Sequence, residues 1–305
     1  MKILVTGGAG YKGVVLVQRL LDQGHAVVIA DNFMYGYQSV LHLVGNPNLE
    51  IKQLDIRNLQ RADVSQFDVI YHLAGISGMP ACAANPHAAE MINVEATRRL
   101  CTLLSSQQLI INASTTSFYG ALGKECTESV DVQPVSIYGI TKYQAEKLVQ
   151  QRENSISLRF ATVFGVSARM RVDLLVNDFT YKAVKERAVV LFDSGSRRTF
   201  LHIQDAISAY LFALDHQSEM RGQVFNVGSP ALNYSKLEIA QAISKCVKYE
   251  IINSALPDLD RRDFLVSFDR LWALGYKTER TLGNGVCDLT KLYQFYSPNH
   301  SSSIV

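Results

Sequence analysis

The chain has 305 residues, of which 48% are hydrophobic and 19% charged, a balance typical of a globular protein with one large α/β domain or two smaller lobes. Its formal net charge of +2 is too small to indicate binding to nucleic acid or to a membrane surface. We find no secretory signal and no apolar run of about 18 residues. The five scattered cysteines are interpreted as reduced thiols, so a cytoplasmic protein is expected.

Short β-rich runs alternate with helical patterns over the first 160 residues. The predicted strands are residues 2–6, 26–30, 49–54, 69–73, 109–113 and 156–160. The predicted helices are residues 14–23, 85–104 and 137–151. Because the strands are apolar throughout, they predict a parallel sheet covered on both faces. The predicted class is therefore α/β, a doubly wound parallel sheet of the Rossmann type.

The alternation weakens after Gly165. Residues 199–214 and 223–227 are predicted to add one helix and one strand to the first sheet. We therefore expect a large first lobe made of residues 1–165 and about 197–230. A smaller α/β lobe would consist of residues 166–196 and about 231–305.

A glycine-rich run, residues 7–13 (GGAGYKG), directly follows the first predicted strand. Gly7 permits a tight turn, Gly10 lets the backbone approach a pyrophosphate, and Gly13 lets the next helix pack close to the sheet. The N-terminus of that helix offers free N–H groups and a positive dipole end to phosphates. The context of strand, turn and helix predicts a dinucleotide-binding site that includes Tyr11 and Lys12.

The second predicted strand ends at Asp31 and Asn32. A carboxylate at this position accepts hydrogen bonds from the adenosine ribose and repels a 2′-phosphate. No arginine follows Asp31 immediately, so NAD is favoured over NADP as the cofactor. Asp55 and Ile56, after the third strand, are candidates for bracketing the adenine ring; an ordinary aspartate at a strand end is the alternative.

Tyr138 and Lys142 are four residues apart in a predicted helix, so they share one face. A free tyrosine is a poor base near pH 7, and a fixed ammonium nearby favours its phenolate form. Residues 114–120 (STTSFYG), at the end of a strand, place hydroxyl groups at the sheet edge where open α/β folds bind ligands. One of these hydroxyls could hold a substrate oxygen while Tyr138 takes its proton.

Together these motifs resemble the extended short-chain dehydrogenases of the NAD-dependent nucleotide-sugar epimerase and dehydratase family. The resemblance runs from Met1 to about residue 295. Further motifs in family order are residues 71–75 (YHLAG) and 158–165 (LRFATVFG). The resemblance implies NAD as cofactor, a nucleotide-diphosphate sugar as substrate and no metal. It also implies a homodimer, in which helices 85–104 and 137–151 pair across a two-fold axis.

The resemblance also implies roles for individual residues. Thr115, Tyr138 and Lys142 would be catalytic, and Lys142 would also hold the nicotinamide ribose. Leu73, Ala74 and Gly75 would contact the cofactor. The residues implied for the substrate are Asn93, Thr116, Ser117, Thr162, Asn177, Arg198 and either Arg261 or Arg262.

The two residues after Thr115 narrow the choice of reaction. Dehydratases of this family have Asp-Glu there, whereas this chain has Thr116 and Ser117. The glutamate of the decarboxylases is also missing. A 4-epimerase or a C4 dehydrogenase is therefore expected, and the epimerase is favoured because the fold most often performs that reaction. Residues 158–182 nevertheless resemble GDP-heptose C4 dehydrogenases more than UDP-glucose 4-epimerases. A 4,6-dehydratase and a non-catalytic NAD-binding protein are the remaining alternatives.

Overall fold

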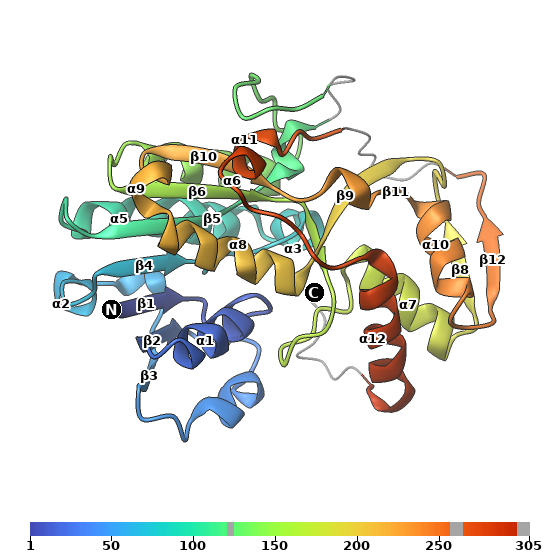
Figure 1. Cartoon of the computed structure of the whole chain (residues 1–305), viewed down its shortest axis with the longest axis horizontal. Helices are drawn as coiled ribbons and strands as arrows, with labels where there is room; N and C mark the ends of the chain where they lie inside the picture. Colours follow the sequence, from blue (N-terminus) through green and yellow to red (C-terminus); the bar gives the residue numbers. More distant parts are fainter. Residues whose placement is uncertain (121–124, 257–264, 298–305) are drawn as a thin grey trace.

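A seven-stranded parallel sheet forms the centre of the computed structural model, which describes residues 1–120, 125–256 and 265–297 (Figure 1). Its strands lie in the order β10-β6-β5-β4-β1-β2-β3. In chain order they are β1 (Lys2–Thr6), β2 (Ala26–Asp31), β3 (Leu49–Gln53), β4 (Val69–His72), β5 (Leu109–Thr115), β6 (Ser155–Phe160) and β10 (Gln223–Val227). The predicted doubly wound α/β class is confirmed.

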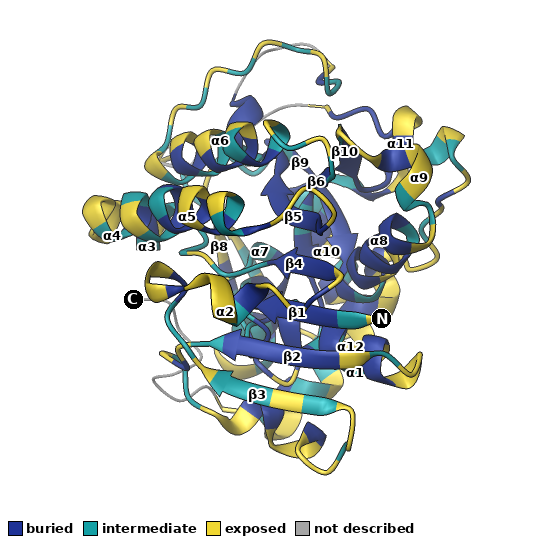
Figure 2. Ribbon diagram, turned by 90° about the vertical axis from the view of Figure 1, so that its left-hand side faces the viewer, coloured by how far each residue is buried: buried dark blue, intermediate teal, exposed yellow. Residues whose placement is uncertain are grey.

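Helices cover both faces of this sheet because its strands are apolar on both sides. Ile3 and Val5 of β1 belong to the core beneath α1 (Gly13–Asp22) and α8 (Ile203–Asp215), whereas Leu4 belongs to the opposite core. Figure 2 shows the second layer, which contains α5 (Ala96–Leu103) and α6 (Ile137–Gln150). The sheet is thus a buried platform between two helical layers.

Strand order reverses direction between β1 and β4, which pair side by side although two strands separate them in the sequence. The chain proceeds outward to β2 and β3 on one side, and to β5, β6 and β10 on the other. Ligands of open α/β sheets bind at the carboxyl ends of the strands beside such a switch point. The topology therefore predicts a ligand site formed by the residues that follow β1, β4, β5 and β6.

The long helix predicted over residues 85–104 is interrupted. It consists of α4 (Pro86–Glu90), a π-helical turn η3 (Met91–Glu95) and α5, and a further short helix, α3 (Met79–Ala84), precedes it. The π-helical turn contains Asn93, whose side chain is buried. An additional residue in one turn changes the direction of the side chains that follow, which apolar periodicity alone does not reveal.

The second lobe is built from segments on both sides of α8 and β10 in the sequence (Figure 1). It contains β8 (Ala188–Leu191), β11 (Asn233–Ser235) and β12 (Glu250–Asn253). β7 (Thr162–Phe164) and β9 (Arg197–His202), which the predicted bounds of 1–165 and about 197–230 place in the first lobe, pair outside the large sheet. These strands form one sheet in the order β11-β9-β7 and a separate parallel pair of β12 with β8. The helices α7 (Leu175–Lys185), α10 (Lys236–Ser244) and α12 (Leu282–Phe295) share a second apolar core with them.

The helix predicted over residues 199–214 is wrong at its start. Residues 197–202 form β9, and α8 begins only at Ile203. Thr199, Phe200 and Leu201 are buried between β7 and β11, where β-branched and aromatic side chains pack well on a pleated surface. His202 then caps α8 through its side chain, which accepts a hydrogen bond from the backbone N–H of Gln204.

Shorter elements complete the described parts of the chain. They are η1 (Gln38–Leu43), η2 (Ile56–Asn58), α2 (Arg61–Val64), η4 (Thr116–Tyr119), α9 (Gln217–Met220), η5 (Pro230–Leu232) and α11 (Asp269–Ala273). No helix in these parts has both the length and the apolar content that crossing a membrane requires.

Candidate active site

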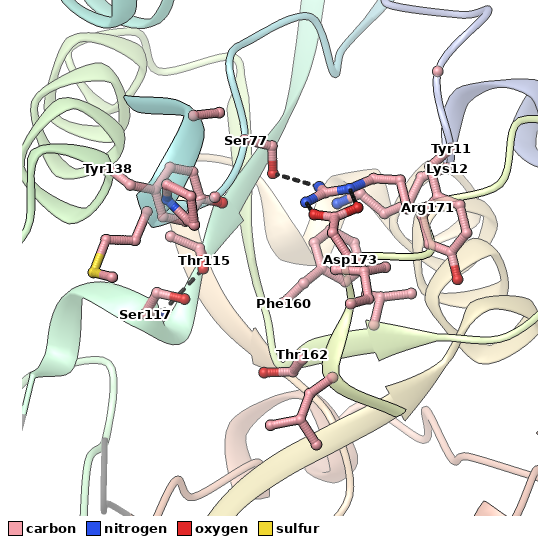
Figure 3. A pocket seen from close by; sticks show the side chains of 18 of the residues that line it. Tyr11, Lys12, Ser77, Thr115, Ser117, Tyr138, Phe160, Thr162, Arg171 and Asp173 are labelled. Carbon is pink, nitrogen blue, oxygen red and sulfur yellow. Dashed lines mark hydrogen bonds and ion pairs between the residues drawn. The ribbon is translucent and has the colours of Figure 1, made fainter. Parts of the chain in front are cut away.

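A cavity of about 540 Å³ lies at the carboxyl edge of the large sheet and extends into the second lobe. Its walls include residues that follow β1, β4, β5 and β6, as the switch point predicts (Figure 3). On the far side it reaches α7, β8 and the start of α10 through Lys182, Val190 and Lys236. One continuous cavity thus joins the two lobes and is large enough for drug-sized ligands.

The glycine turn forms one end of this cavity. Gly7 has a φ of 70°, and a Cβ atom there would lie 2.7 Å from the backbone nitrogen of Ala74. A Cβ atom on Gly13 would lie 2.2 Å from the carbonyl oxygen of Gly7. At Gly10 the only described atom within 4 Å of such a Cβ would be the same carbonyl oxygen, at 3.1 Å, so the backbone is open toward the cavity. Close packing at Gly7 and Gly13 thus leaves no room for a side chain, and Gly10 leaves the backbone accessible from the cavity.

Tyr11 and Lys12 line the cavity beside this turn (Figure 3). The Tyr11 hydroxyl donates a hydrogen bond to the carbonyl oxygen of Gly165 at 2.7 Å, which fastens the turn to the chain that enters the second lobe. The Lys12 ammonium lies 4.0 Å from the centre of the Phe160 ring. Burial, together with the positive charges of Lys142 and Arg171, lowers the pKa of Lys12 to about 7. An anionic ligand would offset this charge repulsion.

Asp31 stands at the end of β2, next to the turn. Its carboxylate accepts hydrogen bonds from the backbone N–H groups of Ala9 at 3.0 Å and Phe33 at 2.9 Å. Burial raises its pKa, and these two hydrogen bonds oppose that effect. Neither Asp31 nor its exposed neighbour Asn32 lines the cavity. Asn32 instead accepts a hydrogen bond from the backbone N–H of Met34.

Asp55 and Ile56 lie farther from the cavity. Asp55 forms an ion pair with Arg57, with an O–N distance of 2.6 Å, and its side chain caps the short helix η2. The hydrogen bond from Arg57 lowers the pKa of Asp55. Ile56 is buried in the core beneath β2 and β4. Neither residue lines the cavity, and the contacts of Asp55 are the local cap of η2 and the ion pair with Arg57. The predicted role of Asp55 and Ile56 beside the adenine ring stays a prediction.

Thr115, Tyr138 and Lys142 meet at the cavity wall, where β5 ends and α6 begins. Figure 3 shows Tyr138 beside Thr115, with Ser117 just beyond. The Thr115 hydroxyl oxygen accepts a hydrogen bond from the backbone N–H of Ser117 at 3.1 Å. Its own proton is therefore oriented away from that N–H and can be donated to a ligand oxygen.

Lys142 follows Tyr138 by one helical turn, and Glu146 follows Lys142 by another. Burial lowers the pKa of Lys142 to about 8, whereas the nearby carboxylate of Glu146 raises it. Ser136 caps this helix through its side-chain oxygen, which accepts a hydrogen bond from the backbone N–H of Gly139. The cap fixes the first turn, and with it the position of Tyr138.

A buried polar network supports this wall from behind. Glu146 accepts a hydrogen bond from the Ser114 hydroxyl at 2.6 Å and forms an ion pair with Arg159 at 2.7 Å. Arg159 also donates to the Tyr119 hydroxyl at 2.7 Å, and Tyr119 donates to Asn226 at 2.8 Å. The network joins α6 to β5, β6 and β10, so it holds the helix that carries Tyr138 against the sheet.

Asn93 holds the loop after β4. Its side chain accepts from the backbone N–H of Ile76 at 2.8 Å and donates to the carbonyl oxygen of the same residue at 3.0 Å. It also donates to the Thr141 hydroxyl at 3.1 Å, next to Lys142. Leu73 and Gly75 line the cavity, whereas Ala74 packs against Gly7. Asn93 does not line the cavity, so its position is that of a support for the loop and for α6.

The residues expected to contact substrate separate into two groups. Ser117, Thr162 and Arg198 line the cavity. Thr116 does not, because its hydroxyl donates to the carbonyl oxygen of Phe160 at 3.3 Å. Asn177 is fully buried and bonds the backbone N–H of Gly165 and a backbone carbonyl oxygen at residue 171. Arg261 and Arg262 lie outside the described residues.

The sequence singled out residues 158–182 by resemblance, but it did not predict that Arg169 and Arg171 of this segment line the cavity. Arg171 forms an ion pair with Asp173 at 2.5 Å and donates to the Ser77 hydroxyl at 3.2 Å, across the cavity (Figure 3). Arg169 also lines the cavity, and its guanidinium lies 4.0 Å from the centre of the Tyr35 ring. Three further lining residues are charged: Asp178, Lys182 and Lys236. The only signal was the run of basic residues at 169 and 171, which no helix or strand periodicity explains.

Among the described residues, no group of three His, Cys, Asp or Glu side chains could hold a metal ion. The site consists of a glycine turn between a strand and a helix, next to a tyrosine, a lysine and a threonine at the edge of a Rossmann sheet. This combination is typical of Rossmann-fold enzymes that use a dinucleotide cofactor. The chain belongs to the NAD dependent epimerase/dehydratase family, whose model matches residues 3–228. It is therefore an enzyme, and NAD is its cofactor.

Relatives and solved structures agree with this assignment. The chain is 33% identical over 247 residues to the uncharacterized UDP-glucose epimerase YtcB of Bacillus subtilis, covering 75% of this chain and 77% of that protein. It is 28% identical to UDP-glucuronic acid decarboxylase 6 of Arabidopsis thaliana, covering 82% and 76% respectively. The structure of UDP-glucuronic acid 4-epimerase from Bacillus cereus, in complex with UDP-glucuronic acid and NAD, is similar with a TM-score of 0.85. That match has 25% identity and covers 97% of this chain and 100% of the other.

Proposed function

We propose that this enzyme oxidises the C4 hydroxyl of a sugar carried on a nucleoside diphosphate, and that it is a 4-epimerase. The observation that carries the proposal is that Thr115, Tyr138 and Lys142 share one cavity with the glycine turn and with Arg198. The first four features suit oxidation of an alcohol beside a dinucleotide. The cavity continues to Arg198, whose guanidinium could form charge-assisted hydrogen bonds with a diphosphate.

In the proposed reaction, bound NAD supplies the acceptor for the hydride that leaves the sugar carbon. Thr115 donates a hydrogen bond to the C4 oxygen and holds it beside Tyr138. Tyr138 then takes the hydroxyl proton as general base. The Lys142 ammonium favours the phenolate form by charge attraction. After the 4-keto sugar rotates, return of the hydride to the opposite face of C4, with the proton of Tyr138 going back to the C4 oxygen, would complete epimerisation.

The lining of the cavity argues against elimination of water. The described residues that line it include two carboxylates, Asp173 and Asp178. Asp173 is paired with Arg171, and Asp178 with Lys182. Neither follows Thr115 at the wall where the sugar would react, since Thr116 and Ser117 occupy those positions. A hydroxyl group is a much weaker acid than a carboxyl group at pH 7, so a 4,6-dehydratase lacks its acid there.

A C4 dehydrogenase is the alternative, because the basic segment around Arg169 and Arg171 is unlike that of common UDP-hexose epimerases. The two reactions differ in their final redox state. An epimerase returns the cofactor to NAD after each turnover, whereas a dehydrogenase accumulates NADH and a 4-keto sugar. Incubating the enzyme with a panel of UDP-, GDP- and dTDP-sugars, followed by mass spectrometry and absorbance of NADH, separates them.

Tyr138→Phe tests the mechanism. This change removes the acid–base oxygen and retains the ring, so we expect the rate of NAD reduction to fall by about a hundredfold or more. Affinity for NAD and thermal stability should change little. The measurement is single-turnover formation of NADH absorbance with the nucleotide sugar selected from the panel.

Two variants complete this test. Lys142→Met should lose similar activity and also bind NAD more weakly, because the ammonium serves both the phenol and the nicotinamide ribose. Thr115→Val should retain more activity than Tyr138→Phe, since Ser117 also lines the cavity nearby. NAD reduction at the wild-type rate by Tyr138→Phe would exclude Tyr138 as the base.

A further inference from the structure

Two cysteines from distant parts of the sequence touch at the surface of the second lobe. Cys246 lies just beyond the end of α10, and Cys287 lies in the second turn of α12. Their sulfur atoms are 3.7 Å apart, and both residues are exposed. This distance is close to van der Waals contact, so nothing stands between the two thiols.

The other three cysteines differ in their surroundings. Cys82 and Cys126 are buried, and Cys101 is half-buried. Burial raises the pKa of Cys82 and that of Cys101 to about 11. Burial and the neighbouring Cys287 also raise the pKa of Cys246, so exposure to solvent, and not acidity, distinguishes the pair. Cys246 and Cys287 are therefore the cysteines that a dissolved oxidant would reach.

Packing beneath the two thiols fixes their juxtaposition. Ile239 and Ile243 of α10 are fully buried in the same apolar core as Val286 and Leu289 of α12. The N-terminal ends are also fixed, because Ser235 and Thr281 begin the two helices with capping boxes. The thiols thus lie on neighbouring helices that cannot easily separate. A disulfide needs its sulfur atoms about 2.05 Å apart, so bond formation requires the two sulfur atoms to approach from their present 3.7 Å.

We propose that Cys246 and Cys287 form a redox modification site, which closes to an intramolecular disulfide when the protein meets a low-molecular-weight disulfide. In the first step, one cysteine thiolate attacks the dissolved disulfide, forming a mixed disulfide and releasing one thiol. In the second step, the other cysteine thiolate attacks the protein sulfur of that mixed disulfide and releases the second thiol. The protein loses two protons and two electrons, and the dissolved disulfide is reduced to two thiols.

The bond would fasten the part of the lobe that lines the cavity. Lys236, the first residue of α10, lines the cavity and donates a hydrogen bond to the carbonyl oxygen of Phe192. α12 packs against α7, which contributes Lys182 to the same wall. A disulfide also constrains the unfolded chain between residues 246 and 287, so it should stabilise this lobe.

The experiment treats the full-length protein with oxidised glutathione at pH 8 and then measures its intact mass and peptide map. We expect loss of two hydrogen atoms, a fall of two in the titre of free thiols, and a peptide that links Cys246 to Cys287. The melting temperature should rise by about 2 °C or more and return to its original value after reduction by dithiothreitol.

Variants separate this site from general oxidation. Cys246→Ser and Cys287→Ser should each retain a stable glutathione adduct on the remaining cysteine and show no rise in melting temperature. Cys101→Ser, the matched control, should behave as the wild type. A lasting glutathione adduct on wild-type Cys246 or Cys287, a link that involves another cysteine, or only disulfide-linked dimers would overturn the proposal.

Discussion

The surroundings of Lys142 lower the pKa of its ammonium group. Burial lowers its pKa to about 8, and the carboxylate of Glu146, one turn further along α6, limits that effect. The folded pKa lies below the ordinary value, so the ammonium is complete below about pH 7 and is lost as the pH rises through about 8. The cation beside Tyr138 is therefore present at neutral pH and absent in alkaline solution.

This leads to a prediction for the pH profile. We expect kcat/KM for the selected nucleotide sugar to fall as the pH rises through about 8, because a neutral amine no longer favours the phenolate. Glu146→Gln removes the charge that supports the ammonium and should move this fall to lower pH. Steady-state rates between pH 6 and 10 provide the measurement. An identical alkaline limb in wild type and Glu146→Gln would show that another group titrates.

Asp31 leads to a prediction about cofactor choice. Its two hydrogen bonds from the Ala9 and Phe33 N–H groups hold a carboxylate at the end of β2. Repulsion of a 2′-phosphate by that charge should make NADP bind at least about tenfold more weakly than NAD, which corresponds to about 1.4 kcal/mol. Calorimetric titration of the wild type and of Asp31→Ser measures this ratio. We expect Asp31→Ser to reduce the ratio of NAD affinity to NADP affinity. Equal affinities for the two dinucleotides in the wild type would contradict the role of Asp31.

A buried ion pair joins Glu146 of α6 to Arg159 of β6. Glu146 and Arg159 have side-chain exposures of 0% and 3%, so water stabilises neither charge. Arg159→Leu should lower the free energy of unfolding by about 3–5 kcal/mol, because it leaves the Glu146 carboxylate buried without its partner. The double variant Glu146→Leu/Arg159→Leu should lose less, since no charge is stranded.

Urea unfolding of the two single variants and the double variant closes this thermodynamic cycle. Arg57→Leu is a matched control, because its ion pair with Asp55 is at the surface and should contribute little. If the losses of the two single variants simply add in the double variant, Glu146 and Arg159 are not energetically coupled.

Elements that the sequence predicts correctly have strong local signals. β1, β2 and α6 begin within a residue of their predicted positions, because continuous apolar strands and glycine turns delimit the first lobe. The sequence does not predict β7, β8 and β12, since strands of three or four residues contain too few positions to establish a period. It assigns part of β9 to a helix because no glycine or proline separates Thr199 from the residues of α8.

Side-chain direction accounts for the differences at the site. A resemblance locates Thr116 and Asn177 in the chain, but backbone geometry turns both away from the cavity. Arg171 was missed for the opposite reason. It reaches Ser77, which is 94 residues away in the sequence, only because the segment folds back over the cavity. Contacts of this kind depend on the tertiary fold and leave no period in the sequence.

Hydrogen bonds across the cavity, as well as the chain itself, join the two lobes of the molecule. The Ser167 hydroxyl donates to the carbonyl oxygen of Tyr11, and Arg171 contacts Ser77. Segments of the second lobe also alternate in sequence with α8 and β10 of the first (Figure 1). Any separation of the two lobes would therefore break these cross-lobe hydrogen bonds.

The outer face of α6 leads to the last prediction. Ile137 and Ile140 are each 37% exposed there, and Met91 on the adjoining η3 turn is 36% exposed. Apolar side chains on a helix pair favour self-association through an isologous two-fold interface. We therefore expect a homodimer, which light scattering should detect as a particle of twice the 33.9 kDa chain mass at micromolar concentration. Ile140→Glu would bury charges at the interface and should produce the monomer.

Leu41→Glu is the matched control, because Leu41 is 63% exposed on η1, away from these helices, and should leave the dimer intact. A wild-type particle of 33.9 kDa, or a dimer that Ile140→Glu leaves unchanged, would show that this face does not mediate assembly.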